Sequence, residues 1–518
     1  MKLLLSFLSI GLCSFTRTYF LPQKVAASAT TNPKPATSRV KKKVAEAAIV
    51  EQPQQLIPNS TAQHEPQQLK LKLQDVVELA LQNNRTIVNA NLQRIIDLEN
   101  LEQAEAKFVP ELIPQARISF RRNEAGIFDN TEEELELGTS VFVIIPTGAQ
   151  VQLDLTGAGQ IQDSSTSSEN FLRQNFLVSL NQPLLRNFGS AINTATIKIA
   201  RLEEQQNQLQ LKSILIETIT NAVFDYRDLV QAQEELKIQQ QALKSARRQL
   251  EITQAFIDAG RQARVDLIPS QTAVANREVE LLAAKNRLQE AQLQLLQTLD
   301  LKQNIEPIAS ETQKVVKPDL PSFTKIIELA FANNPDYLVT FLDIEIAELF
   351  LSLAENDKRW NLDLNVSYDK DLNSISEDSS DFASSLNLNR EFFGNRNLER
   401  EAIRSQILLQ QTRNALAESK ATLKIQVQNS IREVNFRLTE VAQARQATQL
   451  SRQQLEIERE KLRLGRGSII DVIRFEEDLV NAANRELSAV IAYLNALTEL
   501  EETMGTTLET WNIKIEDR

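Results

Sequence analysis

Apolar residues recur every seven positions along two long tracts of the chain, which predicts supercoiled α-helices packed knobs-into-holes. The first tract carries more than one such series, and a tract near the C-terminus repeats the arrangement. The members are Leu202, Leu209, Ile216, Val223 and Val230; Leu229, Leu236, Leu243, Leu250 and Ile257; Leu267, Val274, Leu281, Leu288 and Leu295; and Ile473, Val480, Leu487 and Leu494. Helices with two apolar series need neighbours on two sides, so we expect a closed ring or layer of helices.

The tract from about residue 191 to residue 259 contains neither proline nor glycine. At 1.5 Å of rise per residue, one helix of this length spans roughly 100 Å. The whole chain of 518 residues holds only 12 glycines and 15 prolines. These features predict a mainly α-helical chain with long unbroken elements rather than a compact enzyme core.

Other segments alternate between apolar and polar residues, which predicts strands with one apolar face. Residues 362–369 and 386–389 show this pattern most clearly. The corresponding apolar positions in the first half are Ala116, Ile118 and Phe120; Val151, Leu153 and Leu155; and Phe176, Val178 and Leu180. Such segments are typical of an outer-membrane barrel, although a soluble antiparallel sheet alternates in the same way. No segment after the N-terminus has the roughly 20 apolar residues of a spanning helix, so any membrane part would consist of strands.

The chain is a tandem duplication. Residues 78–84 read Glu-Leu-Ala-Leu-Gln-Asn-Asn, and residues 328–334 read Glu-Leu-Ala-Phe-Ala-Asn-Asn. The same order of helix, strands, long helix, glycine, aspartate and second long helix follows each copy. The predicted divisions are a first repeat at 69–305, a linker at 306–320, a second repeat at 321–507 and a tail at 508–518. Each copy is far longer than a solenoid unit, so function is expected from two half-molecules together.

The N-terminus has the charged start, apolar middle and small-residue cleavage site of a secretory signal over residues 1–29. Cys13, the single cysteine, lies within it, so the mature chain would form no disulfide; a lipoprotein cysteine there is the alternative. Residues 30–68 predict a disordered leader rich in proline, glutamine and lysine, whose basic residues 41–43 suit either a solvated linker or an anionic surface. His64, the only histidine, lies in this leader.

Composition and charge exclude several functions. The formal net charge of −12 does not suit a nucleic-acid partner, which favours a basic face. The sequence contains no Gly-x-Ser-x-Gly elbow, phosphate-binding loop or metal-ligand cluster. The sequence therefore predicts no enzyme, no metal site and no cofactor.

The duplicated frame resembles the TolC family of outer-membrane efflux proteins over essentially the whole of residues 71–507. The residues that carry the resemblance are those of the two repeat starts, together with residues 108–112 before the first strand, residues 182–189 after the strands, and residues 465–471 near the second hairpin end. The resemblance implies a homotrimer with a long coiled-coil α-barrel in the periplasm. It also implies a shared 12-stranded β-barrel in outer-membrane lipid, with four strands from each chain. The first half has extra alternating residues at 134–156, folded about residues 146–148, which could be a loop extension or additional strands, so the strand count stays open.

The resemblance further implies an exit duct without chemistry of its own. Such a duct receives substrate from an inner-membrane transporter of the ABC, RND or MFS type through a periplasmic adaptor. It serves either a tripartite efflux pump or a type I secretion system, for small molecules, peptides or proteins. The alternative from the residues alone is a secreted coiled-coil scaffold without a pore.

The helical hairpin ends are the candidate site. Asp471 aligns with an aspartate that narrows the family's pore, and Asp266 is its counterpart in the first repeat; both could instead cap the helices that follow. Arg474 replaces the family's second ring aspartate and could pair with Asp471. Leu462 and Gly467 occupy the family's latch positions, with Arg466 alongside, so gating by the same salt bridges is not expected. The expected adaptor contacts are Gly260, Arg261, Gly465 and Gly467.

Overall fold

The computed structural model describes residues 67–125, 128–164, 168–302, 304–311, 321–372, 379–390 and 396–514. The predicted signal peptide, Cys13, His64 and the leader up to residue 66 lie outside these residues. All of the described residues belong to one compact unit that begins at Glu65.

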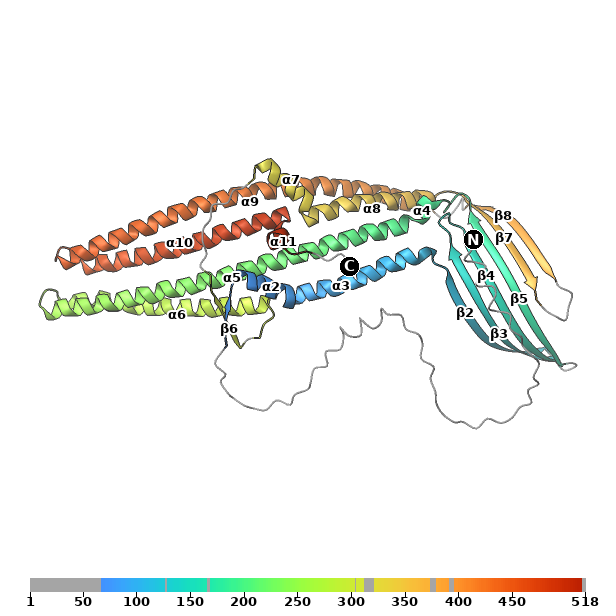
Figure 1. The fold of residues 1–518 in the computed structure, drawn as a ribbon, viewed down its shortest axis with the longest axis horizontal. Coiled ribbons are helices and arrows are strands. Elements are labelled where there is room, and N and C mark those ends of the chain that lie inside the picture. Colours follow the sequence, from blue (N-terminus) through green and yellow to red (C-terminus); the bar gives the residue numbers. More distant parts are fainter. Residues whose placement is uncertain are drawn as a thin grey trace, which may run out of the picture. The chain divides into compact units, whose positions relative to one another are not determined.

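Four long helices form two hairpins, one in each repeat (Figure 1). The first hairpin consists of α5 (Ala195–Asp258) and α6 (Leu267–Thr298), and the second of α9 (Asn397–Arg463) and α10 (Ile469–Met504). Because α5 and α10 touch each other, these helices pack in the order α6, α5, α10, α9. As predicted, no heptad position of the four series is exposed.

Shorter helices continue this layer toward the sheet. The first repeat supplies α2 (Leu73–Asn83) and α3 (Arg85–Glu105), and the second supplies α7 (Phe323–Asn333) and α8 (Pro335–Asp357). Here α3 packs on α5, and α8 packs between α5 and α9. The described part of the chain also contains four brief helices: η1 (Ala106–Phe108), α4 (Ser190–Asn193), η2 (Arg264–Asp266) and α11 (Thr507–Thr510). No helix within the described ranges is long and apolar enough to cross a membrane.

The duplicated Asn-Asn motif joins helix ends. The Asn84 side chain caps α3 and donates from Nδ2 to the carbonyl of Thr298 in the last turn of α6, at 2.8 Å. The Asn334 side chain caps α8 and donates in the same way to the carbonyl of Thr503 in α10, at 3.1 Å. Each asparagine therefore satisfies a free amide at one helix start and binds a carbonyl at another helix end.

The strands form one antiparallel six-stranded sheet in the order β2, β3, β4, β5, β7, β8. Their bounds are β2 (Glu111–Ala125), β3 (Phe128–Ile144), β4 (Gln150–Ser164), β5 (Ser168–Pro183), β7 (Asn361–Asp371) and β8 (Ser380–Asn389). The expectation of four strands per chain is wrong, because the first repeat inserts the hairpin β3–β4. The alternation of apolar and polar residues at 134–156 indicated these strands, whereas the expected number of four strands per chain came from the family resemblance.

The two repeats enter the sheet at equivalent places. β2 begins directly after Pro110, and β7 begins directly after Trp360, so the change from proline to tryptophan does not shift the strand start. A separate two-stranded parallel sheet pairs β1 (Gln67–Leu71) with β6 (Ile305–Ala309), which lies mostly in the expected linker.

Candidate functional site

The two hairpin turns have the same backbone. In the first, Gly260 adopts φ +69° and donates to the Ile257 carbonyl, while Arg261 donates to Phe256. In the second turn, Gly465 adopts φ +72° and donates to the Leu462 carbonyl, three residues earlier, while Arg466 donates to the Lys461 carbonyl, five residues earlier. This is the Schellman ending, which needs a left-handed residue and therefore favours glycine. The predicted contact residues Gly260, Arg261, Gly465 and Gly467 all lie in these turns.

Gly467 is required for a different reason. A Cβ at this position would lie 2.8 Å from the Leu462 backbone nitrogen and 3.1 Å from its Cα. The turn of the second hairpin thus folds closely onto the end of α9. At the family's other latch position, Leu462 is buried with Leu455, Ile469 and Val472.

The aspartates do not cap their helices through their side chains. Ser468 occupies the N-cap of α10 and accepts from the Ile470 amide at 3.2 Å, so Asp471 lies in the first turn, where a carboxylate complements the helix dipole. Asp266 occupies the N-cap of α6 but its side chain makes no capping bond. The capping alternative is therefore wrong for Asp471, and for Asp266 only the position agrees. Their role at a pore constriction stays a prediction.

The arginines of the second turn face solvent. The Arg474 guanidinium lies 5.2 Å from the centre of the Phe475 ring, and this cation–π contact replaces the expected pair with Asp471. Arg466 is exposed beside it. Within the described part of the chain, neither arginine forms an ion pair with Asp471.

Contacts between the two hairpins lie behind the turns, and the sequence did not reveal them. Phe256 of α5 packs against the apolar cluster that contains Leu462. Farther back, Glu476 of α10 accepts from Arg459 of α9 at 2.6 Å and from the Ser245 hydroxyl of α5 at 2.8 Å. An apolar contact and this polar network join the hairpins where the family's latch would act.

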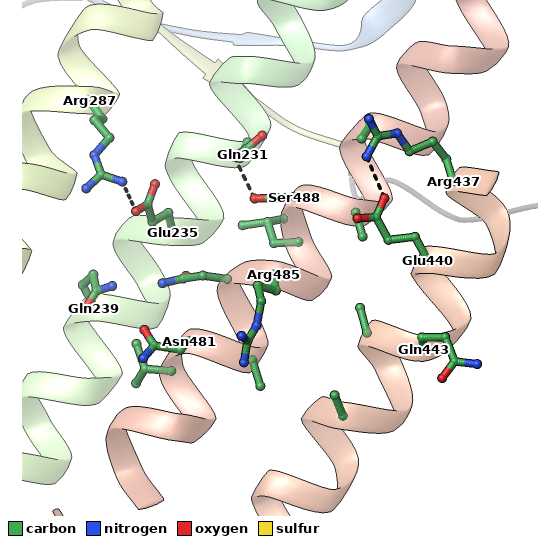
Figure 2. A pocket seen from close by; sticks show the side chains of 18 of the residues that line it. Gln231, Glu235, Gln239, Arg287, Arg437, Glu440, Gln443, Asn481, Arg485 and Ser488 are labelled. Atoms are coloured by element: carbon green, nitrogen blue, oxygen red, sulfur yellow. Dashed lines mark hydrogen bonds and ion pairs between the residues drawn. The ribbon is translucent and has the colours of Figure 1, made fainter. Parts of the chain in front are cut away.

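A polar groove of about 820 Å³ lies between the two hairpins at mid-length (Figure 2). Figure 2 shows Arg287 of α6 paired with Glu235 of α5, and Gln231 of α5 bonded to Ser488 of α10 at 3.3 Å. Arg437 pairs with Glu440 on the α9 side at 2.7 Å. The groove thus follows the contact between the two hairpins, and hydrophilic side chains line much of it.

Acidic residues gather where the Asn334 joint meets α5 and α10. Burial raises the pKa of Glu502 above its ordinary range, and the neighbouring carboxylates Glu217, Glu499 and Asp336 raise it further. A raised folded-state pKa means that the folded protein binds this proton more readily than the unfolded chain. Stability from this group is therefore highest at low pH and falls as pH rises through the raised pKa.

We expect Glu502→Gln to stabilise the joint at pH 7.5 by roughly 0.5 kcal/mol, the scale of a relieved like-charge contact. The gain should shrink as pH falls through the raised pKa, because the wild-type carboxyl then becomes protonated. Amide exchange of residues 499–504 at pH 7.5 and at pH 5 measures the effect. Glu477→Gln, an exposed site on the same helix, is the control. A gain that is equal at both pH values would contradict the electrostatic cause.

Comparisons with known proteins agree with this architecture. Residues 76–300 match the family described as outer membrane efflux protein. The fold is similar to the Campylobacter jejuni CmeC outer membrane channel, with a TM-score of 0.65, 13% identity, and coverage of 84% of this chain and 86% of that one. It is also similar to the open state of the Neisseria gonorrhoeae MtrE outer membrane channel, with a TM-score of 0.64, 14% identity, and coverage of 84% of this chain and 89% of that one. The outer membrane protein VceC of Vibrio cholerae matches with a TM-score of 0.62, 14% identity, and coverage of 84% of this chain and 96% of that one. A comparison with curated protein sequences finds no match.

The helical hairpins and the sheet have the fold of TolC-like outer membrane channels. Residues 76–300 match the outer membrane efflux protein family, and the resemblance seen in the sequence is confirmed. The protein lies in the outer membrane and extends into the periplasm, and the family that residues 76–300 match is channel-forming.

Proposed function

We propose that three copies of the chain form the exit duct of a tripartite efflux pump or a type I secretion system. The duct takes small molecules, peptides or proteins from an inner-membrane ABC, RND or MFS transporter through a periplasmic adaptor. The observation that carries this proposal is that, among the residues that the structure describes, both edges of the sheet and both edges of the helical layer are unpaired. Copies of the same chain are the natural partners for these edges.

The sheet edges are β2 and β8. Ile118 and Phe120 on β2, and Phe382 and Leu386 on β8, are exposed apolar side chains of one sheet face. Unpaired backbone at a sheet edge is not tolerated in hydrocarbon, so a membrane sheet must close.

The helical edges are α6 and α9. Exposed apolar side chains follow the heptad on α9 at Phe436, Leu450 and Ile457, and on α6 at Val279 and Leu293. This spacing is typical of a coiled-coil seam that lacks its partner helix. Joining α9 of one copy to α6 of the next extends the layer and supports a closed tunnel.

The hairpin turns support docking of an adaptor. Val265 and Ile268 in the first hairpin, and Leu464 and Ile470 in the second, are exposed apolar side chains at the ends farthest from the sheet. Apolar patches on an otherwise polar surface commonly mark contacts with another protein.

Conductance in planar lipid bilayers tests the duct. We expect purified protein to give discrete channel steps and Asp471→Ala to lower the preference for cations, because three carboxylates near the axis attract them. Asp478→Ala, two turns farther along α10, should leave the preference unchanged. Steps that are indifferent to Asp471 would keep the duct and remove the acidic constriction. The absence of steps, from protein soluble without detergent, would overturn the duct.

A further inference from the structure

We propose that β3 and β4 belong to the wall of the barrel, so that three copies of this six-stranded sheet close an eighteen-stranded barrel. This inference rests on the trimer proposed above. A wall of four strands per chain would give twelve strands. Since barrel diameter grows roughly linearly with strand number, the outer-membrane pore is about 1.5 times as wide as that of a twelve-stranded barrel.

The hairpin is built into the middle of the sheet and is not attached to its edge. β3 pairs with β2 from Glu111–Phe142 to Ala125–Phe128, and β4 pairs with β5 from Gln150–Asn181 to Asp163–Ser168. β2 and β5 therefore have no direct pairing and are separated by the full width of the hairpin. A loop extension folded above a four-stranded wall would leave β2 beside β5.

The apolar face continues across the inserted strands without interruption. One row of paired residues crosses the whole sheet and is apolar or aromatic in every strand: Leu112, Val141, Leu153, Val178, Tyr368 and Phe382. A barrel wall in lipid requires this continuous outer band, whereas a hairpin inside the lumen would need a polar surface.

The opposite face is polar and hydrogen-bonded across the same strands. Gln115 of β2 donates to the Ser140 hydroxyl of β3 at 3.2 Å, and Ser140 donates to Asp154 of β4. Gln152 also donates to Asp154, at 3.0 Å. On the same face, Asn181 of β5 bonds to Asn365 of β7. The inserted strands thus present the polar side that lines the lumen in the other strands.

The turn that joins β3 to β4 is anchored at the junction with the helices. Gly189 donates to the Thr147 carbonyl at 2.9 Å. Gly148 has φ +96°, and a Cβ there would lie 2.3 Å from the Asn187 carbonyl oxygen. Asn193 holds that same oxygen at 2.8 Å. The hairpin is fixed at its base as firmly as the strands beside it.

Strand parity also fits closure. An even number of strands in an up-and-down sheet makes β8 of one copy antiparallel to β2 of the next, which is the pairing that outer-membrane barrels use. Removal of residues 126–167 would join β2 to β5, still antiparallel, so the same chain offers a twelve-stranded counterpart.

Single cysteines test the wall directly, in the full chain with Cys13→Ser, reconstituted in liposomes. We expect Glu136→Cys of β3 and Gln152→Cys of β4, both only partly buried on the polar face, to react with a charged, water-soluble maleimide as fast as Asn365→Cys of β7. Val141→Cys and Leu153→Cys should react about tenfold slower, as should Val366→Cys, because a thiol in hydrocarbon stays protonated and away from the reagent. If the polar-face and apolar-face cysteines of β3 and of β4 reacted at equal rates, while those of β7 still differed in a conducting channel, the inference would be overturned and the duct would stand.

The deletion of residues 126–167 tests the width. Native mass spectrometry should count three chains in both proteins, and the largest polyethylene glycol that enters from the barrel side should fall by about one third in diameter. An unchanged size limit in a trimer would overturn the inference, as would two chains in the wild-type assembly. The absence of channels from the wild type would count against the duct itself.

Discussion

Gly505→Ala is expected to destabilise the helical part of the protein by about 3 kcal/mol, combining left-handed backbone strain with overpacking. Gly505 ends α10 with φ +69°, and a Cβ at this position would lie 2.4 Å from the Asn333 carbonyl oxygen and 2.9 Å from the Asn334 nitrogen. Both atoms are backbone, and Asn334 is fixed by its own bond to Thr503. The clash therefore falls on a joint that has little freedom to move.

Two other glycines provide a matched control for this prediction. Gly260 and Gly465 end α5 and α9 with nearly the same φ, +69° and +72°, but an added Cβ would meet no atom within 4 Å at either site. Alanine there should cost only the conformational strain, about 1 kcal/mol. Denaturant unfolding of the three variants separates the two causes. Equal losses at all three sites would show that packing at Gly505 contributes nothing.

Asp300 is the counterpart of Gly505 in the first repeat and extends the comparison. It ends α6 with φ +47°, and its carboxylate pairs with Arg85 at 2.9 Å. Asp300→Gly would relieve left-handed strain and lose an exposed ion pair, so we expect a change close to zero. A large loss would mean that the pair stabilises the joint far more than its exposure suggests.

The local patterns predicted more of this molecule than the family resemblance did. Heptads and alternation depend on neighbours along the chain, and they placed the long helices and the strands, including the alternation at Val151, Leu153 and Leu155 that became β4. The four-strand count came from the resemblance and was wrong. The duplicated Asn84 and Asn334 were visible, but their partners at helix ends were not.

Contacts between distant segments explain the other misses. Leu462 occupies a latch position of the family without a polar side chain. In the structure it belongs to an apolar cluster, against which Phe256 of the other hairpin packs. Ser468 caps α10, while the equivalent position before η2 is Ala263, which has no side-chain acceptor. This difference explains why the second hairpin restarts directly as an α-helix and the first passes through η2.

Arg227 is the clearest residue that sequence reasoning missed, because its partners lie 268 and 271 positions away. It is 8% exposed on α5, and its guanidinium donates to Asn495 and to Thr498 of α10, each at 3.0 Å. Burial lowers the pKa of Arg227 to about 10, against the attraction of Glu501. The group remains cationic at neutral pH and joins the two repeats.

Arg227→Ala is therefore expected to cost about 3 kcal/mol at pH 7.5, because removal of the guanidinium leaves Asn495 and Thr498 without their buried hydrogen-bond donor and Glu501 without a nearby cation. Burial raises the pKa of Glu501, and the nearby charge of Arg227 lowers it. Removal of Arg227 therefore raises the pKa of Glu501 further. A carboxylate with a raised folded-state pKa destabilises most at high pH, and the loss should shrink toward pH 5. The double variant Arg227→Ala with Glu501→Gln should recover part of the loss at pH 7.5 and little at pH 5.

Arg85→Ala is the control: it removes an arginine whose side chain is 82% exposed, so it should cost less than about 1 kcal/mol. Denaturant unfolding at the two pH values measures all three, and a loss that does not depend on pH would show that packing and hydrogen bonds, and not the charge, account for the role of Arg227.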